Sequence, residues 1–73
     1  MAMTLKALRT NAGLNQRTAA AKLGVTPETL SSWERGITYP NVIHITKIER
    51  LYRVEYDEIN FFVDDVALSD SEV

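Results

Sequence analysis

The 73-residue sequence has no cysteine, no long apolar run and no basic residue after Arg53. Without cysteine, the chain can form no disulfide, no zinc–thiolate site and no thiol redox motif. No segment approaches the roughly 20 apolar residues that a membrane-spanning helix needs, and residues 1–10 lack the apolar core of a signal peptide. These absences predict a cytoplasmic protein, and the length suits a single small domain.

Groups that could support catalysis or bind a metal ion are also scarce. His44 is the single histidine, and paired carboxylates such as Asp57 and Glu58 are sequence neighbours, which do not face each other on a helix. The sequence contains no nucleophile–base arrangement and no glycine-rich phosphate loop. We therefore expect no enzyme activity, no metal site and no cofactor.

Charge is divided unevenly along the chain, although the total is only −2. Residues 1–53 contain all eight basic residues and three acidic ones, a net charge of +5. Residues 54–73 contain seven acidic residues and no basic one, a net charge of −7. This division is either chance in a short chain or the mark of a cationic body that meets an anionic partner, with an acidic tail that cannot lie on DNA.

The pattern of apolar, capping and stop residues predicts five short helices and no strand pair. Leu5, Leu8 and Ala12 recur at the spacing of one helix face. Threonine and asparagine cap free N–H groups at helix starts, and glycine ends helices in the left-handed conformation. The predicted helices are 5–12, 16–23, 27–35, 42–52 and 56–60, with Thr4, Asn15, Thr26 and Asn41 as caps and Gly13, Gly24 and Gly36 as stops. The buried face predicted for the fourth helix is Ile45, Ile48 and Tyr52, flanked by Val42 and Leu51.

The third predicted helix has two unlike faces. On a helical wheel Leu30 and Trp33 share one side, whereas Glu28 and Arg35 fall near the opposite side. A helix this short is marginal alone, so the second helix must hold it, and the small residues 19–21 permit a close approach. We expect Trp33 to anchor the core and not to serve as a platform for stacking nucleic-acid bases.

Particular residues of the second and third predicted helices, together with the later part of the chain, match a known sequence pattern. Gln16 opens the second helix, Ala20 is small, Gly24 makes the turn, and the third helix ends in "SWERG". Further along, the chain reads "YPN…I..I…Y.V.YDEI". Together these features resemble the lambda-repressor-like, Cro-type (XRE family) helix-turn-helix DNA-binding proteins over residues 4–60. The resemblance implies an all-α, compact five-helix DNA-binding domain, which we place at residues 1–63. Residues 64–73 have neither a hydrophobic period nor bulk and are expected to form an acidic, disordered tail.

The resemblance also implies roles for individual residues. Helix 27–35 would enter the major groove, where Glu28 could accept a hydrogen bond from a cytosine amine or simply favour the helix dipole. Gln16, at a helix N-terminus, would hold a phosphate, and the arginines would contact phosphates or only solubilise the surface. Pro27 and Glu28 depart from the amide side chains common at their positions, and Arg53 replaces a frequent glycine or asparagine. The DNA-binding candidates are Gln16, Arg17, Thr26, Pro27, Glu28, Ser31, Ser32, Arg35 and Thr38.

Two further sets of residues have structural roles by this interpretation. In the family an arginine of the first helix pairs with the glutamate of the third, which predicts an Arg9–Glu34 ion pair that orients the third helix. The apolar run near the end of the domain is expected either to form a dimer seam or to fold back on its own core. The dimerisation candidates are Ile59, Phe61, Phe62 and Val63.

We therefore hypothesise that the protein is a transcription regulator that binds double-stranded DNA sequence-specifically, as a repressor of phage or bacterial type. A homodimer would read a palindromic operator with half-sites roughly 34–36 Å apart. The main alternative keeps the fold but uses it as an antitoxin, antirepressor or protein-docking module. An RNA or single-strand binder is disfavoured because exposed aromatic platforms are missing.

Overall fold

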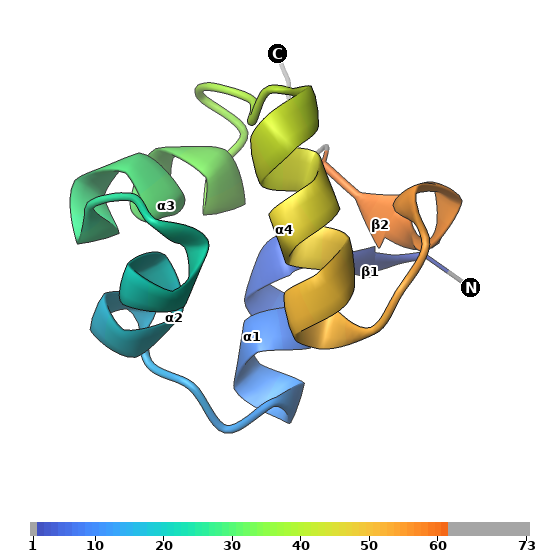
Figure 1. The fold of residues 1–73 in the computed structure, drawn as a ribbon, viewed down its shortest axis with the longest axis horizontal. Helices are drawn as coiled ribbons and strands as arrows, with labels where there is room; N and C mark the ends of the chain where they lie inside the picture. Colours follow the sequence, from blue (N-terminus) through green and yellow to red (C-terminus); the bar gives the residue numbers. More distant parts are fainter. Residues whose placement is uncertain (1, 62–73) are drawn as a thin grey trace, which may run out of the picture.

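The computed structural model describes residues 2–61 as four α-helices, a short 3₁₀ turn and a pair of two-residue strands. In Figure 1, α2 and α3 lie on one flank, and the two strands lie on the other side of α1 and α4. Within residues 2–61, no helix is long and apolar enough to cross a membrane. The elements are β1 (Met3–Thr4), α1 (Leu5–Asn11), α2 (Gln16–Leu23), α3 (Pro27–Glu34), α4 (Val42–Tyr52), η1 (Tyr56–Glu58) and β2 (Ile59–Asn60).

The capping residues set the starts of all four α-helices, as predicted. Each of the four side-chain oxygens accepts a hydrogen bond from the backbone N–H three residues later, and this bond satisfies a donor that the helix itself leaves free. The ends of these helices agree with the predicted ends to within one residue, and Gly13, Gly24 and Gly36 all have positive φ. The four bonds are Ala7 N to Thr4 at 3.1 Å, Thr18 N to Asn15 at 2.8 Å, Thr29 N to Thr26 at 3.2 Å and His44 N to Asn41 at 2.9 Å.

The prediction of a fifth helix over 56–60 is wrong. The Glu58 N–H donates to the Glu55 carbonyl at 2.9 Å, which closes a single 3₁₀ turn, and the Glu58 carboxylate accepts from the Glu55 N–H at 2.9 Å. Ile59 then adopts extended φ and ψ of −102° and 126°. The chain pairs in parallel with β1, in the register Met3 to Ile59 and Thr4 to Asn60. So short a helix is marginal alone, whereas pairing brings Ile59 into the core, and the overall class remains helical.

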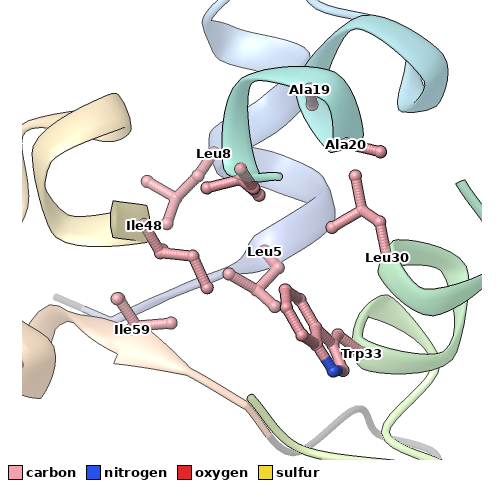
Figure 2. Close-up of a cluster of buried hydrophobic side chains, with 9 residues drawn as sticks. Leu5, Leu8, Ala19, Ala20, Leu30, Trp33, Ile48 and Ile59 are labelled. Atoms are coloured by element: carbon pink, nitrogen blue, oxygen red, sulfur yellow. The ribbon is translucent and has the colours of Figure 1, made fainter. Parts of the chain in front are cut away.

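The core lies where α1, α2, α3, α4 and β2 converge, as Figure 2 shows. On α4, Ile48 is fully buried and Ile45, Leu51 and Tyr52 are half-buried, but Val42 is 78% exposed. Val42 therefore lies beyond the end of the core and does not flank it. The buried apolar residues are Leu5, Leu8, Ala19, Ala20, Leu23, Leu30, Trp33, Ile48 and Ile59.

Candidate nucleic-acid interface

A three-residue turn joins α2 to α3. Gly24 ends α2 with φ of 76°, a left-handed conformation in which glycine is the least strained residue. The N–H of Val25 then donates to the carbonyl of Ala20 at 2.9 Å, closing the helix end. Thr26 begins α3 with Pro27 in the first helical position, where a missing N–H breaks no hydrogen bond. Gly24, Thr26 and Pro27 thus set the direction in which α3 leaves the turn.

The inner face of α3 packs on the rest of the molecule. Leu30 is fully buried and belongs to the same cluster as Ala20 of α2, as Figure 2 shows. Trp33 is 5% exposed and points into the core from the C-terminal half of α3, as expected for a core anchor. The Trp33 and His44 ring centroids are 5.3 Å apart, a contact between α3 and α4 that the sequence analysis did not foresee. With this face held, the opposite face of α3 is turned outward.

Six of the nine DNA-binding candidates line one shallow hollow of about 350 Å³ on the outer side of α3. Glu28 and Arg35 are exposed there, and the serines are half-buried. The lining combines hydroxyl, amide, carboxylate and guanidinium groups, which can donate to or accept from a polar partner. The lining residues are Gln16, Pro27, Glu28, Ser31, Ser32 and Arg35.

The other three candidates lie outside this lining. Arg17 is exposed on the first turn of α2, next to Gln16. Thr26 is exposed, but its hydroxyl oxygen accepts from Thr29 N and lies 3.0 Å from the Thr29 hydroxyl oxygen. Thr38 is exposed in the loop between α3 and α4. Arg17 and Thr38 are therefore exposed but separate from the hollow lining, and the Thr26 side chain is engaged in capping.

A carboxylate shared by three elements lies beneath the hollow. The Arg9 Nε donates to Glu34 Oε2 at 2.7 Å, and a second guanidinium nitrogen donates to Oε1 at 3.2 Å. A third donates to the carbonyl of Leu14 at 2.9 Å. Gln16 Nε2 donates to the same Glu34 Oε1 at 3.1 Å, a bond the sequence analysis missed because it depends on the packing of α2 against α3. One carboxylate thus links α1, α2 and α3.

Burial strengthens this network. The Glu34 side chain is 4% exposed and that of Arg9 is 12% exposed, so water screens the pair little. Hydrogen bonding to Glu34 raises the pKa of Arg9, against the opposing effect of burial. Nearby on α4, burial raises the pKa of Tyr52 to about 12, and the negative charge of Glu34 adds to that increase. The charged form of Arg9 is therefore the only one present at any ordinary pH.

The dimerisation candidates occupy a different part of the molecule. Ile59 is only 7% exposed and belongs to the core of its own chain, so its side chain is not presented to a partner. Phe61 is half-buried, packs against the same core and has its ring centroid 5.8 Å from that of Tyr56. Phe62 and Val63, like the predicted tail, lie outside the described residues.

A tight glycine turn joins α2 to α3, and α3 has a buried apolar face and an exposed polar face. This arrangement defines a helix-turn-helix domain. A family model described as helix-turn-helix matches residues 5–59. The chain belongs to this family, the XRE-type, lambda-repressor/Cro-like DNA-binding regulators. The family is regulatory, not enzymatic. Neither a curated protein nor a solved structure was found to match the chain.

Proposed function

We propose that this protein is a sequence-specific transcriptional repressor of phage or bacterial type that reads duplex DNA in the cytoplasm with α3. The observation that supports this most strongly is the hollow on α3, where five polar side chains and Pro27 come together from α2, α3 and the C-cap of α3. The major groove admits one helix and shows a different pattern of donors and acceptors for each base pair. A short helix with a polar outer face and a buried inner face suits that groove.

The reading residues in this proposal are Pro27, Glu28, Ser31 and Ser32. Glu28 is exposed on the first turn of α3, where its carboxylate accepts from a cytosine amine. The serine hydroxyls bond either type of base, and the proline ring contacts a thymine methyl group. Thr26 contributes indirectly, because its hydroxyl caps α3 and fixes the position of Pro27.

Phosphate groups on either side of the groove would be held by Arg17, Arg35 and Gln16, with Thr38 at the loop. Contacts to phosphates orient the protein but carry no sequence information of their own. We propose that the buried Arg9–Glu34 pair contacts no DNA and acts by orienting α3 and the Gln16 amide, since Glu34 accepts from both partners.

A single α3 reads few base pairs, so we propose a homodimer on a palindromic operator. Two-fold symmetry doubles the contact and sets the half-sites roughly 34–36 Å apart. No part of this proposal requires an effector ligand.

Selection of bound duplexes from a random pool tests the function as a whole. The proposal predicts a palindromic consensus, whereas a pool that stays unenriched overturns it. That second outcome would favour the same fold used as an antitoxin, antirepressor or protein-docking module, which the exposed carboxylate of Glu28 and the net charge of −2 also suit.

Salt dependence of binding to the selected duplex tests the phosphate contacts. The slope of log affinity against log salt is about −0.9 per phosphate neutralised, so Arg17→Ala should reduce its magnitude by about one. Arg50→Ala is the matched control, because Arg50 is exposed in the last turn of α4. Figure 1 shows that this end of α4 lies away from α3. Equal slopes for all three proteins would contradict the assignment of Arg17.

A further inference from the structure

The chain leaves the described part of the molecule beside the loop that joins α3 to α4. Phe61, the last described residue, lines an apolar hollow of about 300 Å³ together with Tyr39 and Pro40 of that loop. Arg35 is the C-cap of α3 and stands four residues before Tyr39, a separation of at most about 14 Å. Phe61 therefore lies near the C-terminal end of α3, where one of the proposed phosphate contacts is located.

The side chain of Arg35 has no charge partner among the described residues. Arg35 is exposed, and within residues 2–61 its guanidinium forms neither a hydrogen bond nor an ion pair. Glu28 lines the same polar hollow but does not pair with it. Arg9 differs, because its guanidinium is bonded to the Glu34 carboxylate. An unpaired guanidinium can bind a phosphate or a carboxylate, since its planar fork of N–H groups matches the oxygens of both.

Carboxylates follow Phe61 at short range in the sequence. Asp64 and Asp65 come three and four residues after it, so they lie within about 11 and 14 Å of Phe61 whatever path the chain takes. Residues 64–73, which we call the acidic segment, contain four acidic residues and no basic one. A tether this short gives a local concentration in the millimolar range. The first two carboxylates of the acidic segment are thus held close to the loop that follows α3.

We infer that Asp64 and Asp65 bind the Arg35 guanidinium in the free protein and that a DNA phosphate displaces them. This inference rests on the proposed function, because it assigns a competitor to one of the proposed phosphate contacts. An exposed ion pair is weak, so the contact lowers affinity for every duplex without abolishing binding. Non-specific binding depends almost entirely on phosphates, whereas an operator also offers base contacts. The acidic segment therefore leaves tight binding to duplexes whose bases α3 can read.

Nuclear magnetic resonance of the ¹⁵N-labelled protein without DNA tests the contact itself. We expect Asp64→Asn/Asp65→Asn to shift the Arg35 side-chain N–H signal, because the guanidinium loses its carboxylate partners. Asp70→Asn/Glu72→Gln is the matched control: it removes the same charge further along the acidic segment and should leave that signal in place. Neither variant alters a residue of the described fold. An Arg35 signal that ignores the first variant, or that responds equally to both, would overturn the inference.

Binding of the same variants to a non-specific duplex and to the selected palindrome tests the competition. We expect Asp64→Asn/Asp65→Asn to raise both affinities about two- to fivefold at low salt, and less at high salt, which screens an exposed pair. The gain should disappear in an Arg35→Gln background, where the competitor has lost its target.

Two further outcomes separate the contact from general repulsion and from the proposed function. A gain that persists with Arg35→Gln, or that Asp70→Asn/Glu72→Gln reproduces in full, would show that the acidic segment only repels DNA at long range, and would overturn the contact. A shifted Arg35 signal in a protein that binds no duplex would leave the contact standing and refute the proposed function.

Discussion

The α2–α3 region and the region formed by α4, η1 and β2 are built differently. In the first, Glu34 bonds to residues of α1 and α2, while Leu30 and Trp33 are buried beneath a polar surface. In the second, Val42, Tyr39 and Tyr56 are more than half exposed, and the strands have two residues each. In our proposal the first region is a rigid surface that reads DNA. The second region keeps large apolar side chains exposed to solvent.

Removing the Glu34 carboxylate, which α1, α2 and α3 share, should reduce the stability of the protein most. Glu34→Ala would leave the Arg9 guanidinium buried and without its charge partner, and the loss of one partner of such a pair costs about 3–5 kcal/mol. Urea unfolding followed by circular dichroism measures the loss. Glu49→Ala is the control, since the Glu49 carboxylate accepts a hydrogen bond from the Tyr56 N–H at an exposed contact. If Glu34→Ala unfolds with the same free energy as the parent, the Arg9–Glu34 pair does not stabilise the fold.

The next effect tests whether the second region is anchored by Ile59. Because Ile59 is 7% exposed in the core, Ile59→Ala should lower the free energy of unfolding by about 2–5 kcal/mol. The apolar control is Ile37→Ala, at a side chain that is 60% exposed, where a change within about 0.5 kcal/mol is expected. If Ile59→Ala instead kept full stability and lost self-association, the residue would belong to a dimer seam after all.

A smaller change in stability is expected at alkaline pH only. It arises from Tyr52 of α4, which lies near Glu34 at the boundary between the two regions. The pKa of Tyr52 is about 12 in the folded protein and about 10 in an unfolded chain, so the unfolded state loses its proton first. The stabilising contribution is therefore complete below pH 10 and is lost as pH rises towards 12. Tyr52→Phe should show a shallower loss of stability over that range than the parent. Equal alkaline slopes would contradict the raised pKa.

The smallest effect should stabilise the second region. Arg53 ends α4 with φ of 57°, a left-handed conformation that costs a residue with a β-carbon about 1–2 kcal/mol. Glycine removes that strain at some cost in chain entropy, so Arg53→Gly should raise the free energy of unfolding by up to about 1 kcal/mol. Thermal melting measures it, with Arg50→Gly, within α4, expected to destabilise. A lower melting temperature for Arg53→Gly would show that this helix end is unstrained.

Signals within a few residues predicted most of the fold. Each cap lies next to the N–H groups it binds, so Asn15 and Asn41 marked the starts of α2 and α4 correctly. The parallel pairing of β1 with β2 joins residues more than 50 positions apart and is too short to leave an alternating pattern. For that reason the segment after Tyr56 was mistaken for a helix.

The same distinction applies to the candidate site. The wheel placed Glu28 and Arg35 on the outer face of α3, because that requires only the helical repeat. The bond from Gln16 to Glu34 depends on how two helices pack, and the exposure of Val42 depends on where the core ends. Neither can be derived from helical spacing alone.

We propose above all that α3 and the start of α2 meet duplex DNA. Amide chemical shifts of the ¹⁵N-labelled protein, titrated with the selected duplex, test this contact. We expect the largest changes at residues 16–17 and 27–35. Large changes confined to residues 39–45 and 56, with α3 unaffected, would show that DNA binds elsewhere or not at all.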